Sequence, residues 1–303
     1  MNNLSQQTSL DPIGLCSTSS VRRALRHFKL RPTKRRGQNF IVDLHALQKI
    51  VMAAQLHPED PVLEIGTGLG TLTAALAQQS SHVTSVENDQ QMFLAARRLL
   101  SSIPNTTLLP GDFLSLDIKN TLGSLHSGPC VVVANLPYYA TKPMLMRLVE
   151  TRQFWKRALV TVQREVADRL CATPGTKAYG VLTIAVRLFS TVKVIENIAP
   201  SCFFPEPKVT SSIVQIEFHE KPRVTVQNHH LLMVLVEAAF AQRRKTLINS
   251  VSSRLHQLSR SEWQNVFHEC SIDTGRRGET LSLDEFAAIA NRLPAVINQS
   301  TND

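Results

Sequence analysis

The feature that most constrains the fold is an apolar segment that runs directly into three closely spaced glycines. Residues 61–66 predict a buried strand. Its last residue, Gly66, begins a turn that also contains Gly68 and Gly70, and a helix follows through Leu76. Glycines between a strand and a helix let the backbone approach a bound nucleotide closely. We therefore expect a ligand at the carboxyl end of a parallel strand.

The same alternation of strand and helix continues along the chain. Further strands are predicted at His82–Glu87, Thr107–Leu109, Cys130–Asn135 and Ala158–Val162, and helices at Leu44–Gln55 and Met92–Leu100. After residue 179 the rhythm changes, and strands at Val192–Ile198 and Ser211–Phe218 would complete the sheet as a hairpin-like edge. The pattern predicts an α/β fold: a Rossmann-like domain with a mostly parallel seven-stranded sheet.

The two ends of the chain differ from this core. Residues 1–20 are rich in Ser, Gln and Asn and predict a disordered lead-in, followed by a helix that Ser20 caps. Beyond a linker at 220–223 the sequence is helical, including one helix at Leu231–Ser250. We predict a basic, partly disordered extension (1–36), a catalytic domain (37–221), a small all-α domain (226–294) and a tail (295–303).

The charge balance favours a polyanionic partner. Lys and Arg number 33 against 24 acids, which gives a net charge of +9, and residues 22–36 hold eight basic residues and no acid. A nucleic acid is a partner that fits such a charge. A basic surface without a specific partner and a transit peptide are the alternative explanations of the basic residues. Five scattered cysteines without a Cys-x-x-Cys pair, together with the lack of a long apolar segment or signal peptide, predict a cytoplasmic protein without membrane or metal sites.

The glycine turn indicates which cofactor is bound. Glu87 closes the next strand 21 residues after Gly66 and can accept both hydroxyls of a ribose, while Asp112 can meet the adenine ring. A nicotinamide dinucleotide prefers G-x-G-x-x-G. This chain has G-x-G-x-G, preceded by Glu64. That form favours S-adenosylmethionine, with a dehydrogenase or a purely structural turn as the alternatives.

The most specific motif is Asn135-Leu136-Pro137-Tyr138, at the tip of the fourth strand. Such a motif fits methyl transfer to an exocyclic amino group such as N6 of adenine. Adenine N6 is a poor nucleophile, because its lone pair is delocalised into the ring. The Asn135 side-chain oxygen and a backbone carbonyl could accept its hydrogens and orient that lone pair. Proline stiffens the turn, and Tyr138 offers a face on which an extruded adenine can stack. An ordinary turn at the end of the strand is the alternative.

Taken together, the motifs resemble the ribosomal RNA adenine dimethyltransferase family, in its KsgA/RsmA branch that modifies small-subunit rRNA. The resemblance covers residues 20–294 and is carried by Gly37–Ile41, Glu64–Gly70, Asn135–Tyr138, Gln163–Ala167, Tyr179–Gly180, Phe203–Val209, Ala241–Thr246 and Gly275–Thr280. One departure is Tyr139–Lys142 (Tyr-Ala-Thr-Lys), where some relatives have Asn-Ile-Ser-Thr; it adds an aromatic ring and a cation near the site.

The resemblance implies a class I methyltransferase fold and a set of site residues. The expected lining of the S-adenosylmethionine pocket is Asn39, Ile41, Gly66, Glu87, Asp112 and Asn135. The target adenine is expected between Asn135–Tyr138 and Phe203. The implied substrate is two adjacent adenines near the 3′ end of 16S rRNA, within an immature ribosomal subunit.

RNA contacts are expected from the two basic segments. They are Arg35, Arg36, Arg243, Arg244 and Lys245. We expect a monomer. Two alternatives are an enzyme of the Erm type, which acts on large-subunit rRNA, and a non-enzymatic assembly factor. For the basic run at 243–245 a solvated helix face is the alternative.

Overall fold

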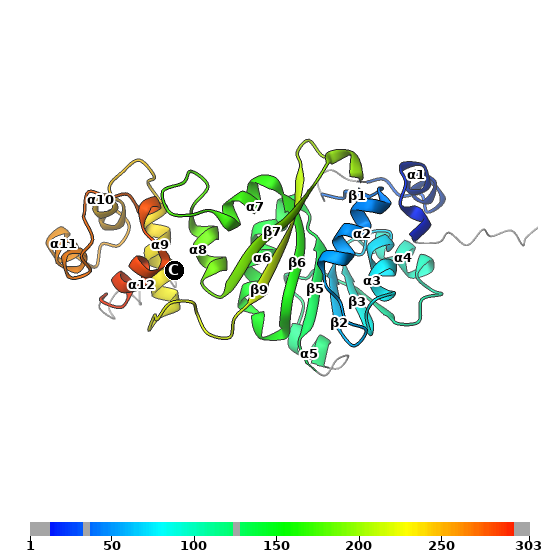
Figure 1. Ribbon diagram of the computed structural model, residues 1–303, viewed down its shortest axis with the longest axis horizontal. Helices are drawn as coiled ribbons and strands as arrows, with labels where there is room; N and C mark the ends of the chain where they lie inside the picture. Colours follow the sequence, from blue (N-terminus) through cyan, green and yellow to red (C-terminus); the bar gives the residue numbers. More distant parts are fainter. Residues whose placement is uncertain (1–12, 33–36, 124–127, 294–303) are drawn as a thin grey trace, which may run out of the picture. The chain divides into compact units, whose positions relative to one another are not determined.

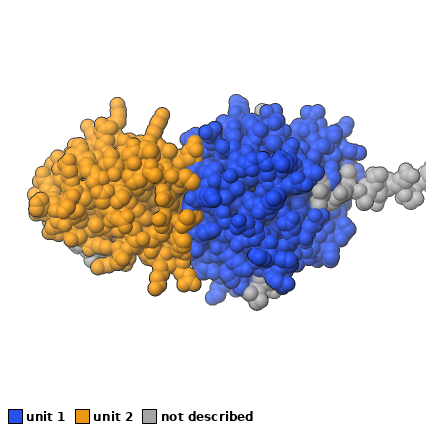
Figure 2. Space-filling view, viewed as in Figure 1, with its two compact units in different colours: residues 1–167, 192–218 blue, residues 168–191, 219–303 orange. Residues whose placement is uncertain are grey.

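The computed structural model describes residues 13–32, 37–123 and 128–293. Contacts between residues divide the chain into two compact units, which Figure 2 colours separately. The sheet unit comprises residues 1–167 and 192–218, and the helical unit comprises residues 168–191 and 219–303. Residues 168–191, which we predicted to lie in the catalytic domain, thus group with the C-terminal helices. The domain boundaries themselves stay a prediction.

The sheet unit is built on a seven-stranded sheet in the order β4-β3-β2-β5-β6-β9-β7 (Figure 1). All described pairs from β4 to β6 are parallel, and β9 runs antiparallel to β6. The strands are β2 (Pro61–Ile65), β3 (His82–Glu87), β4 (Thr106–Pro110), β5 (Cys130–Asn135), β6 (Trp155–Gln163), β7 (Ser190–Ile198) and β9 (Ser211–Phe218). The predicted mostly parallel, Rossmann-like fold is confirmed.

Helices connect the parallel strands and cover the sheet. The parallel strands are connected by α3 (Thr71–Ala77), α4 (Gln90–Leu99), α5 (Ile118–Gly123) and α6 (Thr141–Glu150), whereas α2 (Leu44–Ala53) precedes β2 and α7 (Arg164–Cys171) follows β6. Leu47 and Ile50 of α2 pack with Leu76 of α3 and the central valines of β2 and β5 in one apolar core. The fully buried run Val131–Val133 explains why β5 carries no polar alternation. Among the described residues, no helix has the length and apolarity needed to span a membrane.

The N-terminal segment is more ordered than its composition suggests. Residues 13–20, predicted as part of a disordered lead-in, form a short 3₁₀ turn (Ile13–Leu15) and the start of α1 (Thr18–His27). The Oγ of Ser17, not Ser20, caps this helix by accepting from the Ser20 amide at 3.1 Å. Leu15 is buried and packs in the same core as Leu25. Burial of these few apolar side chains fixes a polar segment against the sheet unit.

The helical unit contains α8 (Val181–Arg187), α9 (His229–Phe240), α10 (Leu247–Ser252), α11 (Arg260–Glu269) and α12 (Leu283–Ala290). The single helix predicted at 231–250 is wrong, because residues 241–246 form a turn between α9 and α10. Within this unit the Arg243 guanidinium donates to the Lys177 carbonyl at 2.6 Å and pairs with Glu279 at 3.2 Å. These contacts join the turn to residues that are distant in sequence. The turn could therefore not be predicted from the spacing of the apolar residues alone.

Candidate active site

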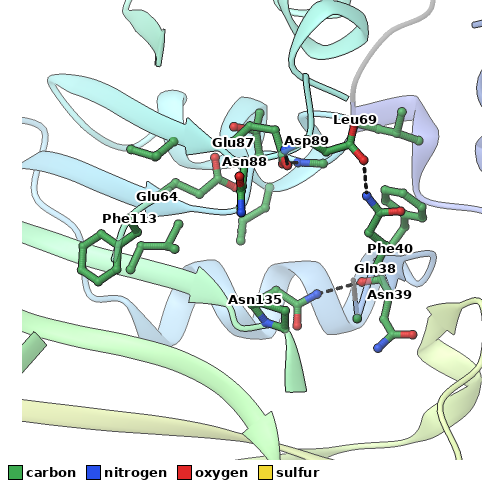
Figure 3. A pocket seen from close by; sticks show the side chains of 18 of the residues that line it. Gln38, Asn39, Phe40, Glu64, Leu69, Glu87, Asn88, Asp89, Phe113 and Asn135 are labelled. Atoms are coloured by element: carbon green, nitrogen blue, oxygen red, sulfur yellow. Dashed lines mark hydrogen bonds between the residues drawn. The ribbon is translucent and has the colours of Figure 1, made fainter. Parts of the chain in front are cut away.

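The carboxyl ends of three neighbouring strands form the site. Because β2 lies between β3 and β5, the glycine turn, Glu87 and Asn135 converge at one edge of the sheet. They surround a cavity of about 220 Å³ (Figure 3). All six residues predicted to bind the cofactor line it: Asn39, Ile41, Gly66, Glu87, Asp112 and Asn135.

The glycine turn leaves room for a ligand at this edge. Gly66, Gly68 and Gly70 have φ values of 89°, 56° and 84°, which L side chains rarely adopt. A Cβ on Gly66 would meet no atom within 4 Å, whereas one on Gly70 would lie 2.9 Å from Leu100. Gly70 is therefore required for packing, and Gly66 keeps open space beside the cavity. This open space fits the backbone approach of a nucleoside.

The Glu87 carboxylate is held in place by backbone donors. Its Oε2 accepts from the Gly68 amide and its Oε1 from the Asp89 amide, both at 2.8 Å. The side chain is buried at the end of β3 and faces the cavity. A carboxylate fixed in this way is suited to accept hydrogen bonds from the two hydroxyls of a ribose.

Glu64, which stands out in the sequence only as the acid that precedes the glycine turn, also has its carboxyl group at the cavity. It is fully buried, and its Oε2 accepts from Thr73 at 2.5 Å and from Ser85 at 2.6 Å. Its Oε1 has no hydrogen-bond partner among the described residues. Burial, with a smaller contribution from Glu87, raises the pKa of Glu64 to about 8. An unpartnered buried oxygen at a cavity wall is the expected mark of a site that a polar ligand completes.

The Asn135 side chain has a fixed orientation. Its amide nitrogen donates to the Asn39 carbonyl at 2.8 Å, the bond drawn in Figure 3. The side-chain oxygen is thereby left as the acceptor at the cavity. The next residue, Leu136, has a buried side chain, and its amide donates to the Thr161 carbonyl. In the part of the chain that the structure describes, the Leu136 carbonyl accepts no hydrogen bond.

Contacts of Pro137 further stabilise the Asn135–Tyr138 motif. Its carbonyl accepts from the Ala140 amide at 3.0 Å and from the Thr141 hydroxyl at 3.1 Å. Gly37 packs so closely that a Cβ there would lie 3.1 Å from the proline Cβ, at a φ of 60°. The segment before β1 (Phe40–Ile41) is thus pressed against the Asn135–Tyr138 motif, which explains why Asn39 meets Asn135.

Tyr138 and Phe203, the two aromatic residues predicted to flank the target adenine, do not share the position of the predicted cofactor residues. Tyr138 is half-buried, with its hydroxyl 2.7 Å from the Ser211 Oγ, and burial raises its pKa. Phe203 opens β8 (Phe203–Phe204), pairs with Ile41 of β1 and is 3% exposed in the core. Neither residue lines the cavity, whereas Tyr139 does. Stacking of the base on Tyr138 and Phe203 stays a prediction.

Several residues that line the cavity were not predicted from the sequence. Gln38 donates to the Asp89 carboxylate at 3.2 Å, which links the segment before β1 to the start of α4 (Figure 3). Phe113 lies beside Asp112, whose Oδ1 accepts from the Leu114 amide at 2.9 Å. Asp89 could have been identified, because an acid two residues after a strand end is a common helix cap. Gln38 and Phe113 carry no such signal.

The predicted RNA contacts are only partly visible. Arg35 and Arg36 lie outside the described residues. Arg243 is committed to its contacts with Lys177 and Glu279, whereas Arg244 and Lys245 are exposed in the turn. Arg276, in the Gly275–Thr280 motif, forms an ion pair with Glu285.

Comparison with known proteins agrees with this geometry. Residues 29–294 match the family model described as ribosomal RNA adenine dimethylase. Two curated relatives are called ribosomal RNA small subunit methyltransferase A. That of Pelotomaculum thermopropionicum is 41% identical over 92% of this chain and 97% of its own length. That of Alkaliphilus metalliredigens is 36% identical over 93% and 98%.

Solved structures give the same picture. A dimethyladenosine transferase from Plasmodium falciparum aligns with a TM-score of 0.67 and 26% identity, over 81% of this chain and 94% of that one. The 23S rRNA methyltransferase ErmE aligns with a TM-score of 0.63 and 25% identity, over 84% and 99%. The predicted enzyme class and S-adenosylmethionine as methyl donor are confirmed. The chain belongs to the ribosomal RNA adenine dimethylase family.

Proposed function

We propose that this chain transfers methyl groups from S-adenosylmethionine to N6 of two adjacent adenines near the 3′ end of 16S rRNA, giving N6,N6-dimethyladenosine during ribosome biogenesis. The bacterial relatives named for the small subunit, at 36% and 41% identity over nearly their whole length, support the substrate. We further propose that it acts in the cytoplasm, as a monomer, on an immature small subunit.

The orientation of Asn135 carries the chemical part of the proposal. Its amide nitrogen is occupied by the Asn39 carbonyl, so its oxygen remains to accept one N6 hydrogen. The Leu136 carbonyl, which accepts no hydrogen bond from a described residue, can take the other. Two acceptors on the amino hydrogens turn the nitrogen lone pair away from the ring and stabilise the positive charge that develops on N6.

The remaining chemistry requires position rather than a strong base. When bound, S-adenosylmethionine supplies a methyl group already activated by its sulfonium charge. Glu87 and Asp112 would hold the nucleoside part, and the unpartnered Glu64 oxygen is a further polar group on the same wall. Once the methyl group is on N6, the nitrogen is more acidic and its proton can leave to solvent. The site residues therefore orient the two reactants and exclude water.

Exposed cations support RNA as the partner. Five Arg and Lys side chains in and just after α1 are exposed: Arg22, Arg23, Arg26, Lys29 and Arg31. The structure describes no ion pair between them and an acid. In the helical unit, Arg244 and Lys245 are exposed as well. Unpaired cations of this kind gain from counterion release on binding phosphates.

The large-subunit alternative has weaker support. ErmE shares the fold but is 25% identical, below the curated small-subunit relatives. The deciding experiment incubates the protein with labelled S-adenosylmethionine and either immature small subunits or large subunits, followed by nucleoside analysis. We expect labelled N6,N6-dimethyladenosine in small-subunit RNA. Label only in large-subunit RNA would reject the proposed substrate.

The Asn135→Ala variant tests the proposed mechanism in the same assay. Removing a preorganised acceptor at the reacting atom should lower kcat by about 100-fold or more. Cofactor affinity, measured by calorimetric titration, should change much less, because Glu87 and the glycine turn remain. Asn265→Ala, at an exposed position on α11, is the matched control and should keep full activity. Normal kcat in Asn135→Ala would contradict the role of its side-chain oxygen.

A further inference from the structure

Tyr139 is an exposed aromatic residue at the cavity. Its side chain is 61% exposed, which is unusual for so large an apolar surface, yet it lines the cavity that holds Asn135 and Glu87. It lies in the 3₁₀ turn Tyr138–Ala140, directly after the motif assigned to the target adenine. An exposed ring at the mouth of a binding site is a candidate contact for a partner.

The contrast with Tyr138 defines what Tyr139 can do. Tyr138 is half-buried and its hydroxyl is bonded to Ser211, so its ring is fixed against the sheet unit. No described residue forms a hydrogen bond or ring contact with Tyr139. Its ring therefore keeps a free face at the rim. The two adjacent tyrosines offer one fixed ring and one accessible ring within a single turn.

Lys142 adds a cation to the same rim. It is exposed in the first turn of α6, three residues after Tyr139, and the described residues form no ion pair with it. The 3₁₀ turn that holds Tyr139 runs directly into α6, which brings Lys142 close to Tyr139 along the chain. The cavity wall carries three acidic side chains besides the buried Glu64, whose pKa is raised: Glu87, Asp89 and Asp112. An uncharged base can enter such a cavity, whereas a phosphate is repelled from it and held by a cation outside.

We propose that Tyr139 and Lys142 form a rim that seats the nucleotide next to the target adenine, with the base stacked on the Tyr139 ring and its phosphate bound by Lys142. The inference rests on the proposed RNA substrate. Aromatic stacking accepts any base, so the rim positions the strand rather than reading its sequence. Since two adjacent adenines are the proposed targets, the rim would hold one while the other is methylated.

The test compares four variants in steady-state methylation of the subunit RNA that the wild type modifies. Tyr139→Ala should raise the KM for RNA about tenfold, within the range measured for loss of one stacked base. Tyr139→Phe should retain the wild-type KM, since the ring and not the hydroxyl is used. Lys142→Gln should lower the salt slope of RNA affinity by about 0.7–0.9. Met52→Ala, which removes a 74% exposed apolar side chain on α2, is the control and should change nothing.

Stacking on Tyr139 can be measured directly with a single-stranded RNA that carries 2-aminopurine beside the target adenine. Its fluorescence should be quenched on binding to the wild type and to Tyr139→Phe but not to Tyr139→Ala. Equal loss of S-adenosylmethionine and RNA affinity in Tyr139→Ala would assign the ring to the cofactor and overturn the inference. Unchanged KM and unchanged quenching would do the same. A wild type that modifies only large-subunit RNA would reject the proposed substrate but leave the rim testable on that RNA.

Discussion

Two carboxylates in the cavity are held by different kinds of donor. Glu87 accepts from two backbone amides, one on each carboxylate oxygen. Glu64 is fully buried and accepts from two hydroxyls on one oxygen only. The sequence predicted Glu87 because a strand end fixes its place. It could not predict the state of Glu64, which depends on how deeply Thr73 and Ser85 enclose it.

Glu64 should make stability depend on pH. Its pKa in the folded chain is about 8 against an ordinary value of 4.5, so the folded state binds the proton more tightly than the unfolded state. The free energy of unfolding should therefore fall as pH rises from about 4.5 to about 8. Glu64→Gln should remove this decline, which is on the order of 3 kcal/mol. Urea unfolding at pH 5 and pH 8 measures it.

Glu64→Asp is the control for this prediction, since it retains a titrating carboxyl at the same place. It should keep the decline with pH even if it is less stable at every pH. The same pH slope in wild type and in Glu64→Gln would mean that another group is responsible, or that water reaches this carboxyl.

At the scale of elements, the strands were predicted better than the helix ends. The strand predicted at Ser211–Phe218 has the bounds of β9, because alternating and β-branched residues mark a strand locally. The helix at 231–250 failed because its apolar period continues across a break. Arg243 donates a hydrogen bond to Glu279, 36 residues away in the sequence. The local pattern of apolar and polar residues contains no information on that contact.

The basic face of α1 should contribute to RNA affinity. Val21, Ala24 and Leu25 are buried, so Arg22 and Arg26, one turn apart, face solvent. The Arg22 guanidinium also lies 5.0 Å from the centre of the Phe204 ring, beside β1. Replacing both arginines with Gln should weaken RNA binding and lower its salt slope by about 1.4–1.8, measured by titration at several salt concentrations.

The matched control removes two cations elsewhere in the sheet unit. Lys119 on α5 and Lys193 on β7 are both exposed, and the double Gln variant has the same net charge as the α1 variant. Its salt slope should stay close to wild type. An equal loss in both double variants would mean that net charge, rather than the α1 face, determines the affinity.

For the whole molecule, the fold class could be predicted from local patterns, whereas the grouping of residues 168–191 with the later helices could not. A Rossmann-like sheet follows from repeated strand–helix segments, and the insertion of β9 between β6 and β7 agrees with the predicted hairpin-like edge. Residues 168–191 were predicted as part of the catalytic domain because they continue the chain from β6 without a linker, whereas contacts between residues group them with the helical unit. Their contacts lie with later helices: the Tyr179 hydroxyl donates to the Leu281 carbonyl at 2.9 Å. Such pairing over a hundred residues is set by packing alone.

Cofactor binding should therefore stabilise one unit selectively. All residues that line the cavity belong to the sheet unit, so S-adenosylmethionine at 100 times its Kd should add about 2.7 kcal/mol to that unit alone. In scanning calorimetry of the full chain, we expect two transitions, of which one rises by roughly 5–10 °C. Glu87→Ala, which removes the carboxylate at the ribose position, should abolish the shift. A single transition that moves as a whole would show that the two units unfold together, and would contradict their independence.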